Sequence, residues 1–210
     1  MCGRFVFSGK NWPDFIDDLD KPEIQPNYNT SPQDESPVVH MEADQFKIAS
    51  MQWGLRPSWS KKSSMEPINI RIETVQSKPM FRDAYRQRRC IIPADGWYEW
   101  MTTPRGKVPF YHRPTDNSVL LLAGIFEQWS NEGYVIQTFG LLTQEATSNV
   151  AHVHNRMPVL LKSFEAKQWI QEGKVSTDTT ELEIYPVARE VNKSTAQGAH
   201  LIRRLRTLFD

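Results

Sequence analysis

The second residue of the chain is a cysteine, and the only other cysteine is Cys90. If Met1 is removed, which so small a residue at position 2 should permit, Cys2 carries an α-amine and a thiol on adjacent carbons. The α-amine has a pKa near 7.7 to 8.0, so roughly a tenth or more of it is neutral and nucleophilic at neutral pH. The amine can form an imine with an aldehyde, and the thiol can then close a five-membered thiazolidine. This terminus therefore suits covalent capture of an aldehyde.

Other interpretations of Cys2 remain open. The terminus could act as an N-terminal nucleophile hydrolase, whose thiolate attacks a peptide or small amide while the amine serves as base. Cys2 could also be a small buried residue at the start of a strand. A zinc site that combines the two cysteines with His152 and His154 is disfavoured, because the chain lacks the Cys-x2-Cys spacing of such sites. We predict no metal and no cofactor.

The segment INIRIET, residues 68–74, could contribute polar side chains to a site near Cys2. Asn69, Arg71 and Glu73 alternate along what we expect to be a strand, so their side chains should project from one face. The simpler alternative is that Asn69 satisfies a turn.

Two more segments carry titratable groups. PADGWYEW places Glu99 between two aromatic residues, and HVHNRMP contains His154 and Arg156. Histidine has a reference pKa near 6.5, so His154 can both accept and donate a proton near neutral pH. Glu99 could instead lie on the polar face of a half-buried strand.

Together with MCGR at the N-terminus and YNTSP at 28–32, these segments resemble the SOS response-associated peptidase (SRAP) family in the family's own order. The resemblance covers nearly the whole chain, through the motifs MCGRF, WGLRPSW, INIRIETVQSKPMF, PADGWYEW, HNRMPVLL and the Val-Asn near the C-terminus. It implies a DNA-repair protein that removes its own Met1 and links Cys2 to abasic sites in single-stranded DNA, with lyase chemistry through the imine. A non-enzymatic module that binds single-stranded DNA, in which Cys2 is incidental, is a further alternative. A ring-opened abasic sugar is an aldehyde, which is the electrophile that Cys2 requires.

The resemblance also implies roles for individual side chains. Asn69 would orient Cys2 and hydrogen-bond the sugar, Glu99 would shuttle protons at the amine and the sugar oxygen, and His154 would act as acid and base. The implied catalytic set is Cys2, Asn69, Glu99 and His154.

A second implied set binds the DNA. Its arginines would clamp phosphates on either side of the lesion, because a planar guanidinium gives directional pairs. Pro32 and Met80 would wedge between bases, and Trp53 or Trp59 could stack on a base, although most tryptophans of such a chain belong to the core. The set is Arg4, Asn29, Pro32, Trp53, Arg71, Met80, Thr143 and Arg156.

The segment between these motifs is rich in cations: Lys78, Arg82, Arg86, Arg88 and Arg89. Such a run is usually the solvated face of a helix. Because it lies between two proposed site segments, it could also form a local basic wall for the DNA backbone, with binding that weakens steeply with salt.

The composition limits the classes of partner. Lys+Arg 25 against Asp+Glu 25 gives a formal net charge of zero, so any site for a polyanion must be a local patch. No apolar run approaches the roughly 18 residues of a membrane span, and the start of the chain lacks the pattern of a signal peptide. Two distant cysteines indicate free thiols in a reducing compartment. We expect a cytoplasmic monomer without membrane association, which binds single-stranded DNA containing abasic sites and is nucleoid-associated when bound.

The elements that must position these residues are mainly strands. Short β-branched and aromatic segments predict strands within 38–54, 90–100, 108–114, 119–129, 134–143 and 157–161. Helical patterns are fewer and fall at 11–19, 80–89, 144–153 and 163–173, the last with Ser163 as its N-cap and its end near Gly173. The sequence therefore predicts one α+β domain, residues 1–210, with a mainly antiparallel, barrel-like sheet and a few flanking helices, the SRAP fold by resemblance.

Overall fold

The computed structural model describes residues 2–60, 66–175 and 180–205. The strands in these ranges are β1 (Arg4–Phe7), β2 (Asn27–Thr30), β3 (Glu35–Glu42), β4 (Gln45–Trp53), β5 (Asn69–Arg71), β6 (Arg89–Ala94), β7 (Gly96–Thr103), β8 (Gly106–Pro114), β9 (Leu120–Asn131), β10 (Tyr134–Glu145), β11 (Arg156–Pro158), β12 (Leu160–Leu161) and β13 (Leu182–Pro186). The helices are α1 (Arg82–Gln87) and α2 (Ala166–Glu172), with short 3-10 segments η1 (Asp14–Ile16), η2 (Ser163–Glu165), η3 (Arg189–Asn192) and η4 (Ala199–Ile202).

Five of the strands close into a barrel. β10 pairs in parallel with β4, and the antiparallel pairs β4–β3, β3–β6, β6–β9 and β9–β10 complete the ring. The segment 38–54 thus forms parts of two strands, which turn at Ala43 and Asp44 with φ of 47° and 61°. The short strands β5 and β11 pair with β10, and the short strand β12 pairs with β9. The predicted fold class is confirmed, because the sheet is mainly antiparallel and barrel-like and the helices are few.

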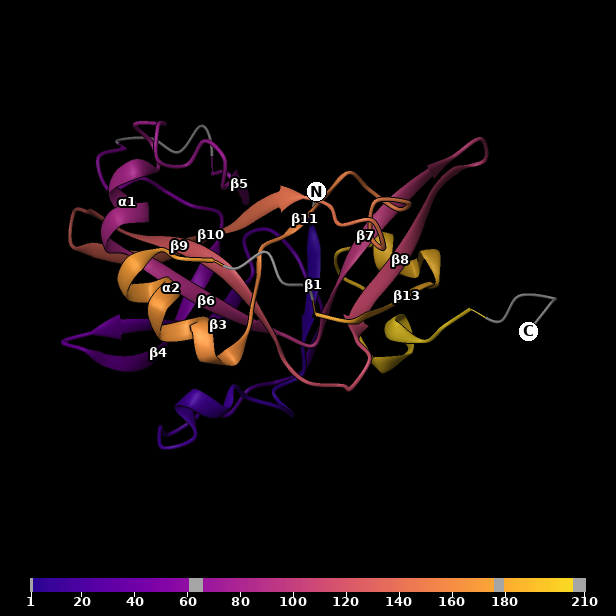
Figure 1. The fold of residues 1–210 in the computed structure, drawn as a ribbon, viewed down its shortest axis with the longest axis horizontal. Helices are drawn as coiled ribbons and strands as arrows, with labels where there is room; N and C mark the ends of the chain where they lie inside the picture. The colour runs from indigo at the N-terminus through magenta and orange to yellow at the C-terminus, as the bar shows by residue number, and fades with distance from the viewer. Residues whose placement is uncertain (1, 61–65, 176–179, 206–210) are drawn as a thin grey trace.

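A second, antiparallel sheet has the strand order β13-β8-β7-β1-β2. Figure 1 shows β1 in the middle of the molecule, with the barrel strands and both helices on one side and β7, β8 and β13 on the other. The chain passes from β6 to β7 between Ala94 and Gly96. A Cβ atom on Gly96 would overlap the carbonyl oxygen of His112 and the ring of Tyr111, so this crossing requires glycine.

Each face of the barrel wall is buried against a different partner. Along β6, Cys90 and Ile92 belong to a core cluster that also contains Phe5 and Trp97 of the second sheet. Ile91, which points to the opposite face, belongs to a cluster with side chains of α1 and α2. Burial of both faces explains why these strands are almost continuously apolar, and it fixes their register.

The helical predictions are confirmed only in part. α1 and α2 lie inside the expected segments, and α2 ends at Gly173, whose φ is 73°. Ser163 was predicted to be the N-cap, but Lys162 occupies the N-cap position, before η2. The hydroxyl of Ser163 donates a hydrogen bond to Asp14 instead.

Two other expected helices do not form. The segment 11–19 contains only η1, since Pro13 restricts the chain before it. The segment 144–153 is not a helix, because β10 takes its first two residues and turns follow at 148–153.

Candidate active site

The end of β10 collects two of the segments that the sequence analysis singled out. β5 pairs in parallel with β10, so Asn69 lies opposite Leu141 and Arg71 lies opposite Thr143. β11 pairs antiparallel with the same stretch and places Arg156 opposite Glu145. Two segments more than eighty residues apart in the chain thereby flank one strand end.

The second sheet brings Cys2 and Glu99 to this place. In the antiparallel pairing of β1 with β7, Arg4 lies opposite Tyr98, which is the chain neighbour of Glu99, and Cys2 lies two residues before Arg4. Cys2 is fully buried, and its thiol lies 3.6 Å from the carbonyl oxygen of Arg4. Burial, and then the negative charge of Glu99, raise the pKa of the Cys2 thiol far above its ordinary value. The sulfur is therefore protonated at neutral pH.

Asn69 connects the two halves of the site. Its Nδ2 donates a hydrogen bond of 2.6 Å to the carbonyl oxygen of Cys2. Its Oδ1 is buried and has no hydrogen-bond partner among the described residues. A buried amide oxygen without a donor is costly, so Asn69 holds residue 2 in place and offers an acceptor to a group that enters the site.

Glu99 and His154 are the two groups that the sequence analysis expects to transfer protons. Glu99 is buried, and its Oε1 accepts a hydrogen bond from the backbone N–H of Trp100 at 3.2 Å. The Nδ1 of His154 accepts a hydrogen bond from the backbone N–H of Arg156 at 3.0 Å. Because a backbone N–H can only donate, the neutral ring of His154 must carry its proton on Nε2. The structure thus fixes both the tautomer and the orientation of this imidazole.

Arg156 is held by a carboxylate. Its Nη1 and Nη2 donate to the two carboxylate oxygens of Glu73 at 2.6 and 3.0 Å. Strand β5 ends at Arg71, so Glu73 lies in the turn that follows and not on the strand face predicted for it. The hydrogen bond from Arg156 holds the pKa of Glu73 below its ordinary value, so the pair is ionic at neutral pH. The sequence analysis named both residues but carried no signal of their pairing, because they are 83 residues apart.

The other two arginines of the predicted clamp differ in exposure. Arg4 is half-buried, and its Nη1 donates to the carbonyl oxygen of Gly3 at 2.8 Å. Burial lowers the pKa of Arg4, and the nearby charge of Asp34 opposes that shift. Arg71 is exposed, so it is the most accessible of the three to a phosphate.

Three residues predicted to contact DNA, Asn29, Trp53 and Thr143, lie in the interior and have no exposed surface. Asn29 donates from Nδ2 toward three backbone carbonyls of the C-terminal segment, those of Val191, Lys193 and Ala196. Trp53 is a core side chain whose Nε1 donates to Ile68. The buried hydroxyl oxygen of Thr143 accepts a hydrogen bond from Arg156.

The remaining predicted DNA contacts are at the surface. Pro32 occupies a turn in which Gln33 has φ of 76°, and Met80 lines an apolar groove of about 570 Å³ with Pro67 and Phe81. Trp59 is 66% exposed, unlike Trp53 of the same motif. Trp59 is therefore the residue of WGLRPSW that can stack on a base.

The predicted basic wall is smaller than the sequence indicated. Arg89 is buried, and its guanidinium donates to carbonyls at the C-terminal ends of α1 and α2. Such an arrangement satisfies orphan carbonyls and favours the helix dipoles, so Arg89 has a structural role. Arg88 pairs with the buried Glu127 at 2.8 Å. Lys78, Arg82 and Arg86 remain exposed.

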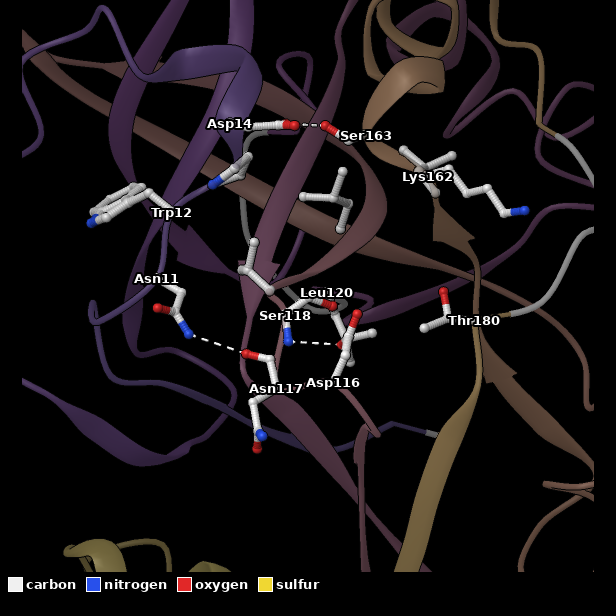
Figure 2. A pocket seen from close by; sticks show the side chains of 14 residues that line it. Asn11, Trp12, Asp14, Asp116, Asn117, Ser118, Leu120, Lys162, Ser163 and Thr180 are labelled. Carbon is white, nitrogen blue, oxygen red and sulfur yellow. Dashed lines mark hydrogen bonds between the residues drawn. The ribbon is translucent and has the colours of Figure 1, made fainter.

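A separate cavity of about 550 Å³ opens between the N-terminal segment, the start of β9 and the chain after β12. Figure 2 shows its polar rim, where Asp14 faces Ser163 and Asn11 donates to the carbonyl oxygen of Asn117. None of the predicted site residues lines it.

Metal sites and membrane spans were sought in the same residues. No group of three or more His, Cys, Asp or Glu side chains that could hold a metal ion occurs in the described part of the chain. Within those ranges, no helix is long and apolar enough to cross a bilayer.

Comparisons with known proteins identify the same family as the sequence motifs. The family model described as SOS response associated peptidase (SRAP) matches residues 1–194. Abasic site processing protein YoaM of Bacillus subtilis is 32% identical over 222 residues, which cover 96% of this chain and 97% of that protein. Abasic site processing protein HMCES of Xenopus tropicalis is 30% identical over 85% of this chain and 63% of its own. A crystal structure of a Bacteroides thetaiotaomicron protein has a TM-score of 0.82 at 21% identity, covering 98% of this chain and all of that one.

Proposed function

Because this chain belongs to the SOS response associated peptidase (SRAP) family, we propose that it processes abasic sites in single-stranded DNA by capturing them covalently through Cys2. The observation that carries the proposal is the environment of Cys2. Its carbonyl oxygen accepts a 2.6 Å hydrogen bond from Asn69, and the charge of Glu99 acts on its thiol. Relatives named as abasic site processing proteins support the same assignment.

The proposed reaction begins when Cys2 acquires a free α-amine. Removal of Met1 by the protein itself must come first, and Met1 lies outside the described residues. The amine adds to the aldehyde carbon of the ring-opened sugar, and loss of water gives an imine. The sulfur of Cys2 then adds to the imine carbon, and the thiol proton passes to the nitrogen. The product is a thiazolidine that contains every atom of the imine and the thiol.

The surrounding side chains have the chemistry that these steps need. The raised pKa of the Cys2 thiol means that a base must take its proton, and the buried carboxylate of Glu99 is the nearby candidate. The Oδ1 of Asn69 can accept a hydrogen bond from the amine or from a sugar hydroxyl. His154, protonated on Nε2, can donate to the sugar oxygen as the ring opens.

The lyase activity follows from the same intermediate. While the imine is open, it acts as an electron sink for the carbon next to it. Loss of a proton from that carbon allows the bond to the 3′ phosphate to break by β-elimination. Closure of the thiazolidine removes the imine, so capture by Cys2 competes with strand cleavage.

Binding of the DNA strand is proposed to depend on exposed groups around the site. Arg71 is accessible to a phosphate, and Trp59 offers an exposed ring for base stacking. Pro32 and Met80 lie at the surface, where a wedge would favour single strands over intact duplex. In this proposal the protein acts as a monomer in the cytoplasm, at the nucleoid when it is bound to DNA.

The test is covalent capture. Protein with a free Cys2 amine is mixed with a single strand that carries one abasic site and is then analysed on a denaturing gel. We expect a shifted band that is lost with Cys2→Ala and lost when the N-terminus is blocked. The matched control Cys90→Ala should retain the band, because Cys90 lies in the core. A band of wild-type strength from Cys2→Ala would refute the proposal, and amide hydrolysis without any band would favour an N-terminal cysteine hydrolase.

A further inference from the structure

Arg156, one of the proposed phosphate ligands, already has an anion bound to it. Both carboxylate oxygens of Glu73 accept from its two terminal nitrogens, at 2.6 and 3.0 Å. This is the bidentate geometry in which a guanidinium also binds phosphate. The carboxylate therefore occupies the edge of Arg156 that a phosphate would use.

The rest of the guanidinium offers no alternative edge. The Nη2 of Arg156 also donates to the carbonyl oxygen and to Oγ1 of Thr143, at 2.6 and 3.3 Å. The Nε is buried and has no hydrogen-bond partner among the described residues, so a phosphate from solvent cannot reach it. A phosphate can bind Arg156 through two hydrogen bonds only if it takes the place of Glu73.

Of the two partners, Glu73 is the one able to move. The side chain of Arg156 is 14% exposed and is anchored to β10 through Thr143. The side chain of Glu73 is 46% exposed and extends from the turn after β5. When the Glu73 carboxylate leaves Arg156, it gives up that ion pair and its hydrogen bond from the backbone of Glu145 at the end of β10, whereas Arg156 keeps its bonds to Thr143.

We propose that Glu73 is a built-in competitor for phosphate at Arg156, displaced when the DNA strand binds. This inference rests on the proposed function, since it takes Arg156 to be a phosphate ligand. Glu73 lowers the affinity for every single strand, so stable binding requires the other contacts of a captured lesion. Glu73 thus sets the strength of strand binding and is not a catalytic residue.

The test compares Glu73→Gln with wild type for an undamaged, fluorescently labelled single strand over a range of salt concentrations. With Gln, Arg156 keeps its full charge for the phosphate, so the slope of log K against log salt should steepen by about 0.7. At low salt the affinity should rise roughly fivefold, equivalent to about 1 kcal/mol. Glu145→Gln is the matched control, because Glu145 lies opposite Arg156 on β10, is exposed, and has no ion pair among the described residues.

Repeating the comparison in an Arg156→Ala background measures the part of the effect that depends on the interaction between Glu73 and Arg156. There, the gain from Glu73→Gln should shrink to the gain from Glu145→Gln, which measures general repulsion of DNA by a carboxylate. An affinity for Glu73→Gln equal to or below that of wild type would overturn the inference, as would an equal gain in both backgrounds. Wild-type protein that binds the strand but forms no crosslink with an abasic site would instead overturn the proposed function.

Discussion

His112 provides a test of the buried structure around the site through the pH dependence of stability. It lies on β8 opposite Trp97, is fully buried, and stacks on the Trp97 ring with centroids 4.5 Å apart. Burial lowers the pKa of His112 to about 3. The folded protein therefore holds this imidazole neutral well below the pH at which an unfolded chain protonates it.

The sign and the size of the effect follow from linkage. The pKa of His112 is lower in the folded state than the unfolded value near 6.5, so its contribution is present above pH 6.5 and is lost as pH falls toward 3. At pH 5 the unfolded chain gains the proton and the folded chain does not. From these two pKa values, the loss between pH 7.5 and pH 5 is about 2 kcal/mol.

Urea unfolding of wild type and His112→Leu at several pH values between 7.5 and 5 measures this loss. We expect the free energy of unfolding of wild type, relative to the variant, to fall by about 2 kcal/mol over this interval. Parallel pH dependence in wild type and His112→Leu would refute the conclusion that His112 is buried and neutral.

Other predictions concern single positions. Glu99→Gln should slow formation or reversal of the crosslink at nearly unchanged DNA affinity, in rapid-quench and binding assays; a collapse of affinity would make Glu99 a binding residue. Trp59→Ala should weaken single-strand binding by about 1–3 kcal/mol, measured by fluorescence anisotropy, without changing the thermal midpoint. Arg89→Met should lower the free energy of unfolding by about 3 kcal/mol, since it leaves several buried carbonyls without donors. Gly96→Ala should destabilise by about 1–3 kcal/mol in urea unfolding, and a neutral result would contradict the close approach of β8.

The local elements were predictable where the pattern was repeated along the chain. Strands were expected from runs of β-branched and aromatic residues, and the C-terminal end of α2 was expected from Gly173. The segment 144–153 was predicted to be a helix and is not one. Its first two residues, Gln144 and Glu145, belong to β10 and pair with β11. Tertiary pairing of this kind outweighs local helix propensity.

The candidate site was predictable in its residue types but not in its contacts. The chemistry of Cys2 alone indicated that it could react with an aldehyde. The family resemblance predicted Asn69, Glu99 and His154 as the other catalytic residues. Trp53 and Trp59 lie in one motif, yet the first is core and the second is exposed, a difference that no local pattern distinguished. The burial of Asn29 was equally hidden, because its partners lie more than 160 residues away.

The sequence by itself determined the chemistry available to this protein, because a thiol beside an α-amine, a carboxylate, an imidazole and several guanidiniums are properties of residue types. Only the tertiary structure decided which of these groups meet. Pairing of β1 with β7 places Glu99 beside Cys2, and the end of β10 brings Arg156 to Glu73 across 83 residues. Charge and burial depend on such distant neighbours, so the raised pKa of Cys2 and the occupied guanidinium of Arg156 follow from folding and not from local sequence.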